Sequence, residues 1–274
     1  MLELSARVNE AVQDISETAV SRFYQPMSWF PHVTLGKTLD KEQRGKTRGY
    51  SMKYEETYRA KFIDRPNRFI AHVALNGKEE TVHVKNTGRC RELLLPGADV
   101  ILSHSGNPSR KTAYDLIVVY KPGIGLVNID SQAPNMVVKE WLQAQDFDLV
   151  RPEYGFGDSR IDFYMEKAKQ KYLMEVKGCT LERDGIGYFP DAPTDRGVKH
   201  LRELAKAASE GYRSYLTFVI QMEGVTKVLP NMEMHPEFGV ALKEAEAAGV
   251  KVLYLPCRVT EDTIYADCGS EIWC

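Results

Sequence analysis

The sequence predicts two domains: a small β-barrel followed by an α/β domain with a central mixed sheet. Residues 52–123 hold about five short alternating strands separated by Gly, Pro and Asn, a pattern typical of small barrels. Beyond residue 124, helical periods alternate with apolar strands, as in a sheet that is covered by helices. The charged run 39–51 has no apolar period and indicates a linker. We therefore expect an N-terminal extension and linker at 1–51, the barrel at 52–123 and the α/β domain at 124–274.

The composition is that of a globular protein without a membrane segment. The chain has 274 residues, of which 43% are hydrophobic and 27% charged. Its five cysteines are scattered and form no Cys-x-x-Cys, which predicts a reduced, cytoplasmic protein without a disulfide framework or zinc site. There is neither a signal peptide nor an apolar run long enough to span a bilayer. A homodimer is compatible with this sequence, although no motif specifies one.

The barrel segment has a local excess of basic residues. Between 52 and 123, Lys and Arg outnumber Asp and Glu by four, although the whole chain has a net charge of −2. The pair Asn76-Gly77 predicts a two-residue hairpin turn between strands at 69–75 and 80–84. Candidate phosphate contacts are Arg65, Arg68, Asn86, Arg89, Arg110 and Lys111. For each of them a solvated rim of the barrel is the alternative.

The α/β segment contains the most informative pair of strands. Residues 159–163 and 172–178 alternate polar and apolar side chains, so Glu175 and Lys177 share one strand face. A hairpin would place Asp162 beside Glu175. Two carboxylates and an ammonium are costly to bury, and binding of a divalent cation is the purpose that explains them. The alternative is a chance Glu-x-Lys on a solvent-facing edge strand.

Two predicted helices flank these strands. The first, at 135–145, is expected to bring Glu140 to the same site. The second, at 195–210, has Thr194 as its N-cap and carries Arg196 and His200 on one face. Arg196 and His200 could clamp a phosphate or assist a leaving group, and the alternative for His200 is a packed core residue. Asp191, in the turn before this helix, is either an extra acidic contact or an Asx turn.

The order of helix, strand with Asp162, strand with Glu175-x-Lys177 and helix resembles the PD-(D/E)xK nuclease core. Longer motifs at 159–163, 175–178, 187–194 and 196–204 resemble the sugar fermentation stimulation protein A family. Upstream, Asn67-Arg68-Phe69 and the stretch 86–89 also resemble this family, so the resemblance runs from about residue 52 to the end. One departure is that Ile161 precedes Asp162, where the simplest nuclease signature has proline.

The resemblance implies an OB fold for the barrel and a metal-dependent nuclease that acts on DNA, with RNA left open. Asp162, Glu175 and Glu140, with the Val176 carbonyl, would hold Mg²⁺ or Mn²⁺, because oxygen ligands favour these ions over zinc. Lys177 would lie near the attacking water, and no small-molecule cofactor is expected. A non-cleaving DNA-binding regulator of sugar metabolism genes is the alternative, and a small-molecule metal enzyme on the same core is the third option.

The extension before the barrel has its own resemblance. Residues 2–22 predict a polar amphipathic helix. The motif at 31–36, Pro-His-Val-Thr-Leu-Gly, resembles one of the two His-x-Thr motifs of the two-histidine phosphoesterases. Those enzymes need a second motif, which this chain lacks. We therefore interpret 1–51 as a fragment of such a domain, with a chance match as the alternative, and assign no catalysis to His32.

Overall fold

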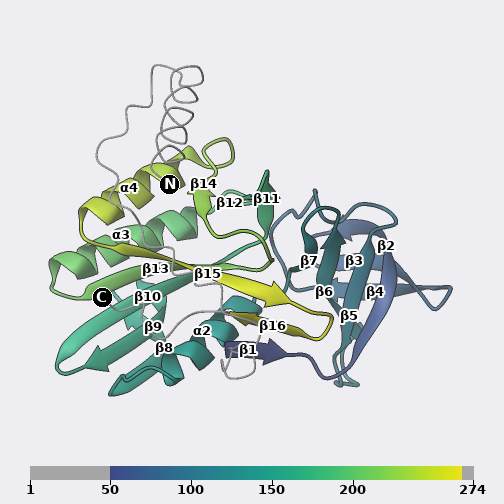
Figure 1. Cartoon of the computed structure of the whole chain (residues 1–274), viewed down its shortest axis with the longest axis horizontal. Coiled ribbons are helices and arrows are strands. Elements are labelled where there is room, and N and C mark those ends of the chain that lie inside the picture. The colour runs from purple at the N-terminus through teal and green to yellow at the C-terminus, as the bar shows by residue number, and fades with distance from the viewer. Residues whose placement is uncertain (1–49, 267–274) are drawn as a thin grey trace, which may run out of the picture. The chain divides into compact units, whose positions relative to one another are not determined.

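The computed structural model describes residues 50–266, and its first domain is a closed barrel (Figure 1). The barrel sheet consists of β2 (Thr57–Asn67), β3 (Ile70–Leu75), β4 (Lys78–Val84), β5 (Asp99–His104), β6 (Tyr114–Lys121) and β7 (Gly125–Asn128). A parallel pairing of β4 with β6 closes the ring of strands β2 to β6, and β7 extends it beside β6. The prediction of an OB-like barrel is confirmed.

Local sequence explains the barrel's turns and its interior. Asn76 and Gly77 both adopt positive φ, 51° and 77°, which the two-residue turn between β3 and β4 requires. Alternate residues of β3, Ala71 and Val73, point into the barrel and are fully buried. The predicted hairpin is thus confirmed, and its register places apolar side chains inside.

The second domain is built on a mixed sheet of seven strands. In spatial order these are β1 (Tyr50–Lys53), β16 (Thr263–Ala266), β15 (Lys251–Val259), β13 (Arg213–Ile220), β10 (Gln170–Cys179), β9 (Ser159–Lys167) and β8 (Leu149–Phe156). The three central strands, β10, β13 and β15, run parallel, and the other neighbours are antiparallel. This confirms the predicted central mixed sheet.

Three described helices cover this sheet. On one face lie α3 (Asp195–Ser209) and α4 (Pro236–Ala247), and on the other lies α2 (Ala133–Gln143) (Figure 1). Thr194 Oγ1 accepts a hydrogen bond from the Gly197 amide at 3.1 Å, so the predicted N-cap of α3 is confirmed. Within residues 50–266 no helix combines the length and apolar character that crossing a membrane requires.

A small third sheet leads the chain toward α3. It contains β11 (Leu181–Arg183), β12 (Ile186–Phe189) and β14 (Val228–Pro230). β12 pairs in parallel with β14 and ends directly before the turn that contains Asp191. This sheet therefore positions the segment 189–194 at the start of α3.

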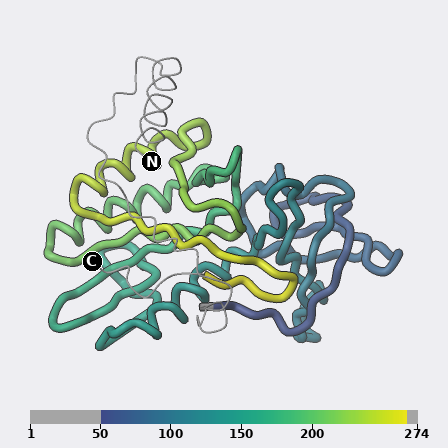
Figure 2. Tube along the Cα trace, in the orientation of Figure 1, coloured from purple at the N-terminus to yellow at the C-terminus, as the bar shows by residue number. Residues whose placement is uncertain are grey.

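Strand β1 departs from the expected domain division. Residues 50–53 were expected at the end of the linker and the start of the barrel, but β1 pairs with β16, at the far end of the described chain (Figure 2). The barrel in turn includes β7, beyond residue 123. Period-two alternation reveals a strand but not its partner, which explains both differences. The predicted helix at 2–22, the motif with His32 and nearly all of the charged run lie outside the described residues.

Candidate active site

Asp162 and Glu175 lie opposite each other at the end of the β9–β10 pairing. The register pairs Phe163 with Met174, so its next step brings Asp162 to Glu175. Opposed residues of an antiparallel pair project to the same face. Asp162 Oδ2 accepts a hydrogen bond from the Val176 amide, and its Oδ1 accepts one from Asn135 Nδ2, both at 2.8 Å. These bonds fix the Asp162 carboxylate toward β10.

Glu175 is almost completely buried, yet its pKa is lowered. Glu175 is only 1% exposed. Its Oε1 accepts hydrogen bonds from Lys177 Nζ and His200 Nδ1. Burial opposes ionisation, but the Lys177 ammonium and the His200 N–H outweigh it and hold the Glu175 pKa below its ordinary value. Among the described residues no group donates a hydrogen bond to Oε2. The carboxylate therefore keeps one buried oxygen available.

The pKa of Asp162 is shifted in the opposite direction, upward. Burial raises its pKa, and the negative charge of Glu175 raises it further, against the opposing effects of Lys177 and the two hydrogen bonds. Two neighbouring carboxylates with opposite pKa shifts form a site that favours an added positive charge. The donor atoms of the two carboxylates are oxygens, and one of them, Glu175 Oε2, has no hydrogen-bond partner among residues 50–266. These residues therefore fit a hard divalent cation.

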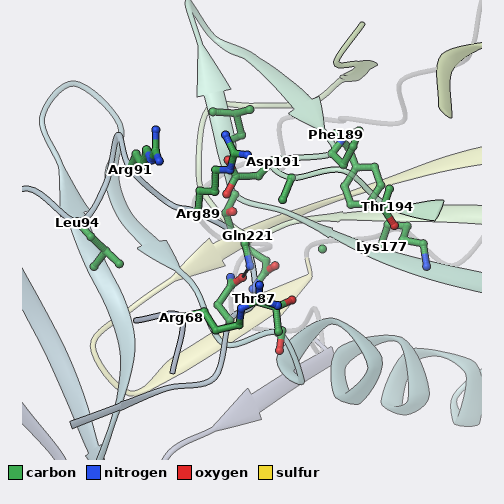
Figure 3. Close-up of a pocket in the computed structure, with 18 of the residues that line it drawn as sticks. Arg68, Thr87, Arg89, Arg91, Leu94, Lys177, Phe189, Asp191, Thr194 and Gln221 are labelled. Atoms are coloured by element: carbon green, nitrogen blue, oxygen red, sulfur yellow. Dashed lines mark hydrogen bonds between the residues drawn. The ribbon is translucent and has the colours of Figure 1, made fainter. Parts of the chain in front are cut away.

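The two carboxylates and Lys177 line a cavity of about 1070 Å³ whose walls come from both described domains. The barrel supplies Arg68, Thr87, Arg89, Arg91 and Leu94, and the α/β domain supplies Phe189, Asp191, Thr194 and Gln221 (Figure 3). Asp191 Oδ2 accepts a hydrogen bond from the Cys90 amide at 2.8 Å. Gly88 also approaches closely, because a Cβ there would lie 2.9 Å from Asp191 Oδ2. Asp191 therefore holds the barrel loop against the turn before α3.

Glu140 requires a correction. Its Oε2 accepts a hydrogen bond from the Ser51 amide of β1, and the side chain is exposed outside the cavity lining. The reason is helical phase: Asn135 points at Asp162, and five residues later the helix has turned by about 140° away from that direction. Within residues 50–266, no group of three or more His, Cys, Asp and Glu side chains is placed to hold a metal ion. Asn135 occupies the position that the sequence assigned to Glu140.

Two of the predicted phosphate contacts instead build the barrel loop that lines the cavity. The Arg65 guanidinium donates to four carbonyl oxygens, those of Arg68, Asn86, Gly88 and Arg89, at 2.6 to 2.9 Å. Asn86 Oδ1 accepts from the Gly88 amide, and its Nδ2 donates to the Ile129 carbonyl. Both side chains lie in the cavity wall, but these hydrogen bonds hold the loop in place.

Two other predicted contacts lie away from the cavity. Arg110 forms a two-pronged ion pair with the buried Asp115, with nitrogen–oxygen distances of 2.6 and 3.1 Å. Lys111 is exposed on the same loop, outside the cavity lining. Sequence alone could not separate these two from Arg68 and Arg89, because all four are basic residues in barrel loops. Arg91, two residues beyond Arg89, lines the cavity and was missed.

The start of α3 faces the cavity. Thr194, Arg196 and Gly197 line it, whereas His200 is 3% exposed and lies behind the wall. The partially positive end of a helix favours anions. Gln221, also missed, lines the cavity and donates to the Asn128 and Asp130 carbonyls at 3.0 and 3.1 Å. A polar residue directly after an apolar strand was the only sequence signal for it.

An OB-like barrel joined to a mixed sheet with an Asp/Glu-x-Lys cluster defines a class of two-domain proteins, and the family comparisons match both domains. Residues 63–129 match the SfsA N-terminal OB domain, and residues 132–263 match the sugar fermentation stimulation protein RE domain. The chain belongs to the sugar fermentation stimulation protein A family.

Curated relatives and one solved structure support this assignment. The chain is 52% identical over 218 residues to a sugar fermentation stimulation protein homolog of Desulfitobacterium hafniense, covering 78% of this chain and 95% of the relative. A homolog from Clostridium beijerinckii is 52% identical, with coverages of 78% and 96%. The structure of Pyrococcus furiosus SfsA in complex with Ca²⁺ is 27% identical, covers 81% of this chain and 98% of that one, and has a TM-score of 0.71.

Proposed function

We propose that this protein is a metal-dependent nuclease that cleaves phosphodiester bonds of DNA or RNA. The observation that carries the proposal is the pair of opposed carboxylates, Asp162 and Glu175, with Lys177 beside Glu175. One buried oxygen of Glu175 has no hydrogen-bond partner in the part of the chain that the structure describes. Burying such a trio is costly unless a cation compensates it. The Pyrococcus furiosus relative is described in complex with Ca²⁺, a cation that also prefers oxygen ligands.

Mg²⁺ or Mn²⁺ is the cofactor that fits these residues. Asp162, Glu175 and the Val176 carbonyl would hold it, and when bound it would activate water and neutralise charge on the phosphate. Asn135 and the Val176 amide orient Asp162, and Lys177 keeps Glu175 ionised. The Lys177 ammonium is positioned to orient a water or to stabilise charge on the scissile phosphate.

The cavity wall supplies contacts for the substrate backbone. Arg68, Arg89 and Arg91 of the barrel and Arg196 of α3 line the same cavity as the carboxylates. The N-terminus of α3 adds oriented amides that favour phosphate. This arrangement favours binding through the sugar–phosphate backbone over sequence readout. We also propose a cytoplasmic location, consistent with free thiols at Cys90, Cys179 and Cys257.

One observation favours the alternative, a DNA-binding regulator that does not cleave. Glu140 is directed to Ser51, so within the described residues the site has two acidic side chains where three were expected. A protein that had lost cleavage could keep the basic cavity wall for binding. The two functions differ in one measurable property, which is metal-dependent hydrolysis.

A cleavage assay tests the proposal. End-labelled single- and double-stranded DNA and RNA are incubated with the purified protein in Mg²⁺, Mn²⁺ or EDTA, beside Asp162→Asn and Glu175→Gln prepared identically. We expect cleavage by the wild type in Mg²⁺ or Mn²⁺, none in EDTA and none by either variant. Binding without cleavage in every metal would establish the regulator instead. Equal cleavage by the variants would show that the activity comes from another site or a contaminant.

A further inference from the structure

His200 connects the carboxylate site to the cavity wall through two contacts. Its Nδ1 makes a hydrogen bond with Glu175 Oε1, on the neighbouring strand β10. Its Nε2 lies 3.3 Å from Nε of Arg196, one turn earlier on α3. The ring is 3% exposed, so neither contact competes freely with bulk water. Both ring nitrogens therefore have fixed partners.

These partners determine which nitrogen carries hydrogen. An arginine Nε–H can only donate, so His200 Nε2 must present its lone pair to Arg196. A neutral imidazole with a lone pair on Nε2 carries its hydrogen on Nδ1. The Nδ1–H then points at Glu175 Oε1, a carboxylate oxygen that can only accept. Arg196 thus donates to His200, and His200 donates to Glu175.

We infer that His200, as a neutral Nδ1–H tautomer, is a positioning residue that fixes Glu175 and Arg196 relative to each other. It holds Oε1 of Glu175, which leaves Oε2 as the oxygen for a cation. It also engages Nε of Arg196, which leaves the other guanidinium N–H groups for a phosphate in the cavity. The inference rests on the proposed function in that Glu175 is taken as a metal ligand.

Substitutions can separate this role from simple packing. The side-chain amide of asparagine places its N–H near the position of histidine Nδ1, whereas the longer glutamine places its N–H near Nε2. His200→Asn therefore keeps the donor to Glu175, and His200→Gln shifts the donor toward Arg196. His200→Leu fills the space without a donor. If His200 only packs, the apolar Leu should be tolerated at least as well as the two polar amides.

Mn²⁺ binding to the full chain, measured by calorimetry, is the first readout. We expect His200→Asn to bind Mn²⁺ within about threefold of wild type, and His200→Gln and His200→Leu to bind about tenfold or more weakly. Arg196→Ala should weaken phosphate-dependent nucleic-acid binding more than Mn²⁺ binding. Arg202→Ala is its matched control, because Arg202 lies on the same helix but pairs with the exposed Glu237. Equal Mn²⁺ affinities for the three His200 variants would overturn the inference.

The imidazole nitrogen chemical shifts of His200 in the wild-type protein provide a second readout that is independent of cleavage. We expect the shifts of a neutral ring protonated on Nδ1; an Nε2–H tautomer or an imidazolium would overturn the inference. Mn²⁺ binding with the expected variant order but no cleavage would remove the nuclease and leave the role of His200 intact. Failure of the wild type to bind Mn²⁺ would overturn both proposals.

Discussion

The two domains each bury an acidic cluster, and the clusters are compensated differently. In the barrel, Asp115 is 3% exposed and meets the side chains of Arg110, Lys85 and His83 at 2.6 to 3.1 Å. In the α/β domain, the Lys177 ammonium is hydrogen-bonded to Glu175 and acts on Asp162 only through its charge. One Glu175 oxygen lacks a donor among the described residues. Three basic side chains contact the Asp115 carboxylate, which indicates a structural role for it. The carboxylates at the cavity have fewer partners, which leaves one oxygen free to bind a ligand.

The pKa shifts express the same difference. Although burial opposes ionisation of Asp115, hydrogen bonds from Arg110 and Lys85 and the Lys85 charge outweigh it and lower the Asp115 pKa to about 2. Asp162, in contrast, has a raised pKa because burial and the charge of Glu175 outweigh its favourable contacts. Ionisation of the buried Asp115 thus stabilises the fold, whereas ionisation of the buried Asp162 costs stability. We expect substitution of Asp115 and substitution of Asp162 to have opposite effects on stability.

The largest expected effect is on cleavage. Asp162→Asn and Glu175→Gln should each lower Mg²⁺-dependent cleavage by at least about a thousandfold, equivalent to about 4 kcal/mol of transition-state stabilisation. Asp162→Asn should leave the melting temperature of the metal-free protein unchanged or raised, since it removes a repulsive charge. Single-turnover cleavage and thermal melts measure the two properties. A large drop in melting temperature for Asp162→Asn would mean that this cluster is structural too.

Asp115→Ala should have its main effect on stability. Removing the carboxylate leaves the partly buried Arg110 and Lys85 without their common partner, which we expect to lower the free energy of unfolding by about 3 kcal/mol. Urea denaturation of the full chain measures the change. Lys61→Ala is the matched control, because Lys61 pairs with Asp99 on the barrel surface and should change stability by less than about 1 kcal/mol. Equal losses would show that burial of the pair is irrelevant.

The stability contributions of Asp115 and Asp162 should change with pH in opposite directions. The Asp115 pKa is lower in the folded state, so its contribution is present above about pH 4 and disappears as the pH falls toward 2, a change of about 2 kcal/mol. The stability difference between wild type and Asp115→Asn should therefore shrink on acidification over that range. The Asp162 pKa is raised, so its ionisation costs stability, and Asp162→Asn should gain on the wild type as the pH rises above 4. Parallel stability curves for wild type and both variants would contradict these assignments.

The smallest expected effects concern the basic cavity wall. Each of Arg68→Ala, Arg89→Ala and Arg91→Ala should reduce the salt dependence of nucleic-acid binding by about one phosphate contact. Lys111→Ala, on the exposed barrel loop outside the cavity, should leave the slope unchanged. Fluorescence anisotropy over a series of salt concentrations measures the slopes. Binding that is indifferent to salt would remove the proposal of backbone recognition.

Sequence patterns predicted the features that depend on the local period of side chains along a strand or helix. They failed for side chains whose role depends on partners that are distant in the sequence. Glu175 and Lys177 on one face follow from strand alternation, and Asp162 lies opposite because two short strands in succession tend to form a hairpin. Asn135 was missed because the sequence gives the period of the helix but not which of its faces packs against β9. Arg65 and Arg110 look like surface cations in the sequence, since only the folded chain brings the loop carbonyls and Asp115 to them.

The pairing of β1 with β16 also has a consequence for synthesis of the chain. The barrel, strands β2 to β7, is inserted between β1 and the rest of the sheet to which β1 belongs. On the ribosome the barrel can close as soon as β6 has emerged, because its strands follow one another in the chain. β1 must wait for β16, more than two hundred residues later, before its partner exists. Until then, the first strand of the sheet exposes an unpaired edge, and a nascent chain arrested after the barrel would present it to chaperones or to other chains.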